Sequence, residues 1–138
     1  MLTGVGQSAR KSAAAALLAA AIGAALDVGY VLVVRSQGYP VDSRVVFYVA
    51  FVAAVSAVTL VGAVVVTLDR RLAQPLLYGA ATGYFLTGAL GIASVGMPLI
   101  VAGVVSIIAA GRRRASFVVI TVAATVPAAT FLIGLMLT

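Results

Sequence analysis

Residues 12–34 of the chain read SAAAALLAAAIGAALDVGYVLVV, an apolar run whose only charged side chain is Asp27. About 20 such residues are enough for an α-helix to cross the roughly 30 Å of hydrocarbon in a membrane. The run therefore predicts a transmembrane helix. It also places a carboxyl group inside the membrane, where ionisable side chains are costly and are functional candidates.

Three further uncharged runs follow, at residues 45–68, 75–110 and 115–138. As one helix, residues 75–110 would be about 54 Å long at 1.5 Å per residue. That is too long for one span, even a tilted one. The segment Ser94-Val95-Gly96-Met97-Pro98 is the natural break, because glycine favours turns and proline favours the first turn of a helix. On the same ground, Pro75 is expected at the first position of the third span.

We therefore predict an all-α integral membrane protein: a single domain over residues 1–138, forming a compact bundle of five transmembrane helices. The expected spans are 12–34, 45–68, 75–93, 97–111 and 115–138, with the third and fourth in a tight hairpin. The fourth is shorter than the usual minimum of about 17 residues, so a re-entrant segment stays open as an alternative. A cleaved signal peptide is the rival for the first span. Because the apolar run continues to Val34, we expect a retained span.

The basic residues predict the orientation, since cytoplasmic loops of membrane proteins carry an excess of lysine and arginine. With five spans and the N-terminus inside, the outer side holds only Arg35 and Arg44. The inner side then holds seven basic residues: Arg10, Lys11, Arg70, Arg71, Arg112, Arg113 and Arg114. With four spans the count becomes four inside against five outside. Five spans, N-terminus in and C-terminus out, are preferred.

The composition excludes several classes of function. Of the 138 residues, 64% are hydrophobic and 9% are charged, against about 25% charged in an average soluble domain. The net charge is +6, but the basic residues are scattered among loops without forming a basic face, so nucleic acid is not expected as a partner. Without histidine or cysteine, the usual haem, zinc and copper sites cannot be built. We expect no enzyme, no metal and no cofactor.

Asp27 is the candidate functional carboxylate. On insertion scales, an aspartate at a helix centre costs about 2.5–3.5 kcal/mol of insertion free energy, which the apolar neighbours can offset. No lysine or arginine lies within a span to pair with it. A buried polar group needs a hydrogen-bond partner. The candidate partners are hydroxyls on the second and third spans: Ser56, Thr59, Thr82, Tyr84 and Thr87. Three roles stay open: a structural buried carboxyl, a proton- or cation-binding group, and a contact with a partner protein.

Small residues predict helix packing in two spans. Ala19, Gly23 and Asp27 follow at intervals of four in the first span, and Gly79 and Gly83 form a GxxxG motif in the third. Such spacing lets helix backbones approach closely. Asp27 continues the first stripe, so we expect it to face another helix. Packing within one chain is favoured over dimerisation.

The loop residues have ordinary interpretations. Arg70, Arg71, Arg112, Arg113 and Arg114 are expected to anchor the topology and to contact anionic lipid headgroups. Asp42 or Ser43 is expected to cap the second helix.

The functional expectation is a non-catalytic, structural or accessory component of a larger membrane assembly, with a protein partner or a second copy of the chain in the bilayer. The alternative is a small proton- or cation-coupled transporter or channel subunit that uses Asp27. Lipid binding or membrane remodelling is a third, less supported class. The bias toward Ala, Val, Gly and Arg suggests a GC-rich genome, and we expect the cytoplasmic membrane of a prokaryote.

Overall fold

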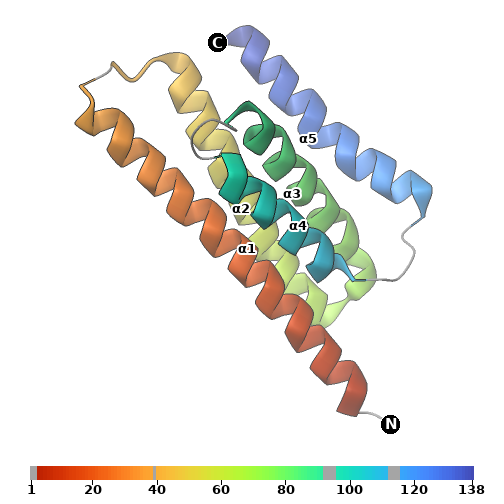
Figure 1. Cartoon of the computed structure of the whole chain (residues 1–138). Helices are drawn as coiled ribbons and strands as arrows, with labels where there is room; N and C mark the ends of the chain where they lie inside the picture. Colours follow the sequence, from red (N-terminus) through yellow and green to blue (C-terminus); the bar gives the residue numbers. More distant parts are fainter. Residues whose placement is uncertain (1–2, 39, 92–95, 112–115) are drawn as a thin grey trace.

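The computed structural model describes residues 3–38, 40–91, 96–111 and 116–138. Five helices account for nearly all of them (Figure 1). They are α1 (Thr3–Ser36), α2 (Ser43–Leu68), α3 (Arg70–Leu90), α4 (Gly96–Ala110) and α5 (Phe117–Leu137). The described residues contain no strand. The predicted all-α class and the short fourth helix are confirmed.

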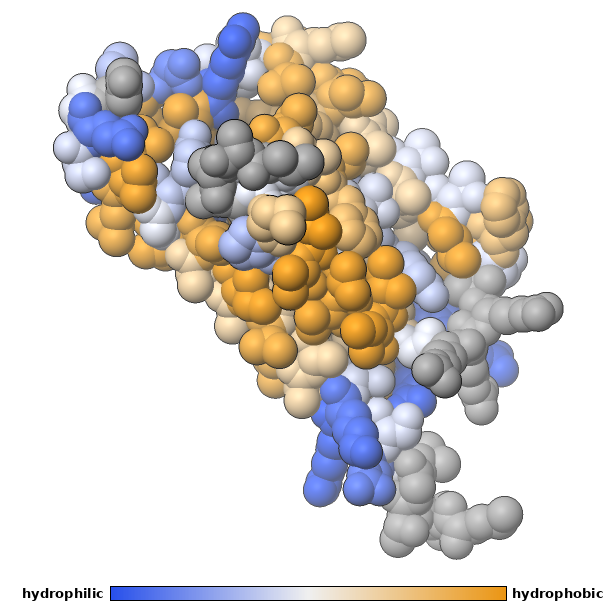
Figure 2. All heavy atoms as spheres, viewed as in Figure 1, coloured by the Kyte–Doolittle hydropathy of each residue, from blue (hydrophilic) through white to orange (hydrophobic). Residues whose placement is uncertain are grey.

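Three of these helices are long and apolar enough to cross a membrane by length and composition: α1 over Gly6–Ser36, α2 and α5. The apolar helix α4 has 15 residues and is about 22 Å long. Figure 2 shows hydrophobic residues over the middle of the visible face and hydrophilic residues gathered toward its two ends. This distribution is the one expected for a membrane protein, whose polar groups lie where the bilayer meets water.

Two helices begin earlier than predicted. Helix α1 starts at Thr3, so the polar residues before the apolar run are helical as well. Helix α3 starts at Arg70, and the prediction that Pro75 opens this helix was wrong. The reason is Asp69, whose side chain accepts a hydrogen bond from the Arg71 amide at 2.8 Å and caps the helix one turn earlier.

The helix ends are fixed by local hydrogen bonds. Of the two residues expected to cap α2, Asp42 does so, because its Oδ1 atom accepts from the Val45 amide at 2.9 Å. Asp69 closes α2 and opens α3: its amide donates to the Val65 carbonyl at 2.8 Å while its side chain caps α3. Helices α2 and α3 therefore reverse direction over a single residue.

Helices α1 to α4 form an antiparallel ring in which each helix packs mainly against two others of the ring (Figure 1). Helix α1 packs against α2 and α4, and α3 packs against the same two helices from the opposite side. Helix α5 lies outside this ring and packs mainly on α3. We call the end that holds residue 138 and the α1–α2 loop the C-terminal end, and the opposite end the N-terminal end.

The core is divided into two clusters along the bundle. The cluster nearer the C-terminal end contains aromatic and branched side chains: Ala19, Phe51, Val52, Val55, Ala80, Tyr84, Leu99, Ala102 and Phe131. The cluster nearer the N-terminal end has only apolar members, most of them alanine: Ala16, Ala63, Val66, Ala73, Leu77, Ala109 and Ala110. Small side chains let the helices approach closely there, as is common between membrane helices.

Candidate functional site around Asp27

A cluster of buried hydroxyl groups occupies the middle of the ring. The Tyr84 hydroxyl, on α3, lies 3.1 Å from Ser56 Oγ and 3.4 Å from Thr59 Oγ1, both on α2. It also lies 3.4 Å from the Ala19 carbonyl oxygen on α1, and Tyr84 is fully buried. A buried polar group left without a partner costs about 1–3 kcal/mol, so moving one of these helices away would carry that cost. The cluster therefore holds α1, α2 and α3 together at one point.

Gly23 leaves the space that the hydroxyl cluster fills. A Cβ atom added to Gly23 would lie 2.6 Å from the Tyr84 hydroxyl oxygen and would collide with Ser56 Oγ. Ala19, one turn away, is fully buried and supplies the carbonyl that faces Tyr84. The small stripe of α1 therefore runs along the inside of the ring.

The hydroxyls expected to pair with Asp27 bond to other groups. Ser56, Thr59 and Tyr84 bond within the cluster just described. Thr82 donates to the Tyr78 carbonyl at 3.1 Å, and Thr87 donates to the Gly83 carbonyl at 2.8 Å. The physical reason is that threonine hydroxyls in a helix readily bond the carbonyl four residues earlier. None of the five is hydrogen-bonded to Asp27 among the described interactions.

Asp27 instead borders a small cavity between α1, α2 and α4. The volume open to a water molecule is about 10 Å³, close to the least that can hold one water. Its lining residues are Leu26, Asp27, Tyr30, Tyr48, Val52 and Leu99. The Oδ1 atom of Asp27 is buried and has no hydrogen-bond partner in the described structure.

Two tyrosines form the polar side of this cavity. Tyr48 donates a hydrogen bond from its hydroxyl to the Thr87 carbonyl at 3.1 Å, which ties α2 to the last turn of α3. The ring of Tyr30 lies 5.4 Å from the ring of Tyr48, measured between centroids. Tyr30 follows Asp27 by three residues and so lies beside it on α1.

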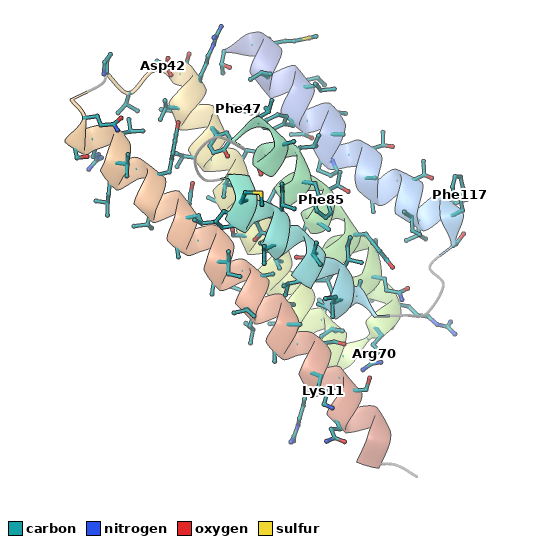
Figure 3. All side chains as sticks on the ribbon, viewed as in Figure 1. Lys11, Asp42, Phe47, Arg70, Phe85 and Phe117 are labelled. Atoms are coloured by element: carbon teal, nitrogen blue, oxygen red, sulfur yellow. The ribbon has the colours of Figure 1, made fainter. Side chains whose placement is uncertain are left out.

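The same two tyrosines line a larger cavity that reaches the C-terminal end. This cavity has a volume of about 220 Å³ and extends to the exposed residues Asp42 and Arg44. A second cleft, of about 800 Å³, shares Tyr30 and Leu26 with the Asp27 cavity and also reaches Asp42. Figure 3 shows Asp42 at this end of the molecule and Lys11 and Arg70 at the opposite end.

The glycines of the GxxxG motif face two different neighbours. A Cβ atom on Gly79 would lie 3.1 Å from the Ala123 carbonyl oxygen of α5. A Cβ atom on Gly83 would lie 2.5 Å from a methyl group of Val55 on α2. Both glycines therefore make close contacts within this chain.

Two of the arginines expected to contact lipid headgroups, Arg70 and Arg71, lie at the N-terminal end. Arg70 donates to Ser8 Oγ at 2.8 Å, which links the start of α3 to α1, and Arg71 is exposed. Arg112, Arg113 and Arg114 lie outside the described residues. No group of three or more potential metal-binding side chains occurs in the part of the chain that the structure describes.

Comparison with known protein families, with curated proteins and with solved structures finds no match to this chain.

Proposed function

We propose that this chain is a five-span protein of a prokaryotic cytoplasmic membrane, with its N-terminus inside and its C-terminus outside. The alternating direction of the five helices supports it. Arg10, Lys11, Arg70 and Arg71 then share one side, and the α4–α5 connection that contains the triple arginine begins and ends on that side. Arg35 and Arg44 are on the other side, which agrees with the positive-inside rule.

Within this membrane the chain acts as a non-catalytic accessory component that binds another membrane helix. The observation that carries this proposal is the outer face of α5. Helix α5 packs mainly on α3, and only Ala123 and Phe131 of its residues are buried. The opposite face is exposed and has small residues at its centre: Thr121, Thr125 and Ala129, at intervals of four.

This face is suited to a close helix–helix contact. The hydroxyls of Thr121 and Thr125 bond carbonyls of their own helix at 2.9 and 2.7 Å, so they present little unpaired polarity. In lipid there is no hydrophobic drive to bring helices together, and close packing of small residues takes its place. Large side chains at these positions would keep a second backbone away.

The test is isolation of the protein in mild detergent from its native membrane, comparing wild type with the double variant Thr125→Ile/Ala129→Ile. We expect wild type to carry a partner chain, or a second copy, in fixed ratio. The double variant should lose it at least tenfold while keeping the same melting temperature. Ala53→Ile, at an exposed alanine of α2, is the matched control and should retain the partner. A wild-type chain that is isolated alone and has its own ligand-dependent activity would overturn the proposal.

A further inference from the structure

Asp27 has a carboxyl oxygen without a hydrogen-bond partner in the described structure. Its Oδ1 atom is buried beside a cavity that has room for about one water molecule. By contrast, every other buried hydroxyl described here bonds a carbonyl or another hydroxyl. An orphaned carboxyl oxygen next to a water-sized cavity points to a bound water.

The cavity has enough oxygen atoms to bind a proton but too few to coordinate a metal ion. A bound water could donate to Asp27 Oδ1 and contact the hydroxyl of Tyr48, whose own proton is directed to the Thr87 carbonyl. A hard cation such as Ca²⁺ needs six to eight oxygen ligands, and this cavity has a single carboxyl and two phenol groups. A proton needs one acceptor, and a protonated carboxyl is the form that an apolar surrounding favours.

The described cavities next to Asp27 lie toward the C-terminal end of the bundle. Toward the C-terminal end, Tyr30 and Tyr48 line both the Asp27 cavity and the 220 Å³ cavity that reaches Asp42 and Arg44. Toward the N-terminal end, Gly23 is pressed against Ser56 and Tyr84, and Ala19 and Ala16 on the same helix are fully buried, so the described packing is close on that side. Proton relays through membranes are built from chains of polar groups that can exchange protons. The buried hydroxyls on this side, among them Ser56, Thr59 and Ser106, bond one another, Tyr84 or helix carbonyls, and the small cavity that Asp27 lines does not include them.

The titratable and charged groups that line the cavities next to the Asp27 carboxyl also lie toward the C-terminal end. On α2, Tyr48 lines the same small cavity as Asp27. Asp42 and Arg44 line the 220 Å³ cavity that Tyr48 also borders. From α1 the carboxyl meets Tyr30, and from α4 it meets Leu99, in a helix whose sequence has no titratable residue. On α3 the fully buried titratable group is Tyr84, which belongs to the cluster at Gly23.

We propose that Asp27 is a proton-binding site that exchanges with the C-terminal end of the bundle alone, through the tyrosine-lined cavity, and does not conduct protons across. The site responds to pH on one side of the membrane. Loading and unloading the proton changes the charge between α1, α2 and α4. This goes beyond an accessory role and does not depend on it, and it excludes the transport role for Asp27.

The test is infrared difference spectroscopy of the carboxylic-acid C=O stretch in oriented proteoliposomes. The chain has only three acidic side chains, so Asp42→Asn/Asp69→Asn leaves Asp27 as the single side-chain acid. Asparagine is as good a helix cap as aspartate, so this background should fold. The expected band titrates when pH is changed in the compartment that also labels a cysteine placed at Gln37, and stays constant when pH changes in the other.

Two variants assign the band. Asp27→Asn should remove it completely, and Asp27→Glu should shift its frequency without removing it, which covers the case in which Asp27→Asn fails to fold. A band that never titrates, or that follows the opposite compartment or both, overturns the proposal. Proton flux in wild-type liposomes that is lost in Asp27→Asn overturns it too. Because sidedness is measured against residue 37, an error in the proposed membrane orientation would not affect the result.

Discussion

Replacing Gly23 with leucine will prevent the ring of helices from closing. An added Cβ atom would lie 2.6 Å from the Tyr84 hydroxyl oxygen and 2.8 Å from its Cε1 atom, and it would collide with Ser56 Oγ. Overpacking a core typically costs about 1–3 kcal/mol, and a leucine brings three more carbons into the same space. It also breaks the hydroxyl cluster, which leaves buried oxygens unpaired at about 1–3 kcal/mol each.

Gly29→Leu is the matched control, since Gly29 is on the same helix and a Cβ atom there meets nothing within 4 Å. Both changes raise helix propensity equally, so any difference between them comes from packing. We expect the Gly29 variant to elute as a single species in detergent and to melt near the wild-type temperature. The Gly23 variant should aggregate or melt far below it. Equal melting temperatures would contradict the packing assigned to α1.

The second large effect is expected at the α3–α4 turn, with Gly96→Val. Helix α4 begins at Gly96, whose amide donates to the Gly91 carbonyl at 2.7 Å. An added Cβ atom would lie 2.5 Å from the Gly91 carbonyl carbon and would collide with the Gly88 carbonyl oxygen. These are backbone atoms, which cannot rotate aside as a side chain can. The cost should therefore reach or exceed the upper end of the usual range, about 3 kcal/mol.

Met97→Val controls for the introduction of a β-branched residue in the same turn, because Met97 is 64% exposed. The measurement is thermal unfolding followed by circular dichroism in detergent, together with protease cleavage in the segment between α3 and α4. Gly96→Val should melt earlier and be cut faster, whereas Met97→Val should match wild type. A Gly96 variant that is as resistant as the control would show that the two helices need not approach this closely.

Much of the fold could be predicted from the sequence, because lengths of uncharged sequence determine helices in a membrane protein. The break expected before Pro98 predicted a short fourth helix, and its predicted start is within one residue of the observed start at Gly96. The start of α3 was missed because the cap at Asp69 outweighs the signal of Pro75. The side chain at Asp42 caps α2 as expected.

The candidate site was only partly visible in the sequence. Tyr30 could have been found, since it follows Asp27 by three residues on one helix. Tyr48, Val52 and Leu99 come from other helices. Their approach to Asp27 depends on how each helix is rotated about its axis. Periodicity indicates that rotation when one face is polar and the other apolar. Helices α2 and α4 are apolar on nearly all sides, so their sequences carry little of this information.

The central claim is that five helices cross the membrane with the N-terminus inside. The most direct test is labelling of single cysteines in intact cells with a membrane-impermeant maleimide. The sequence has no cysteine of its own, so each label reports on the introduced residue alone. Ser8→Cys and Ser116→Cys should be labelled only after permeabilisation, whereas Gln37→Cys and Thr138→Cys should be labelled in intact cells. Labelling of Ser116→Cys from outside, together with a protected Thr138→Cys, would contradict the five-span account.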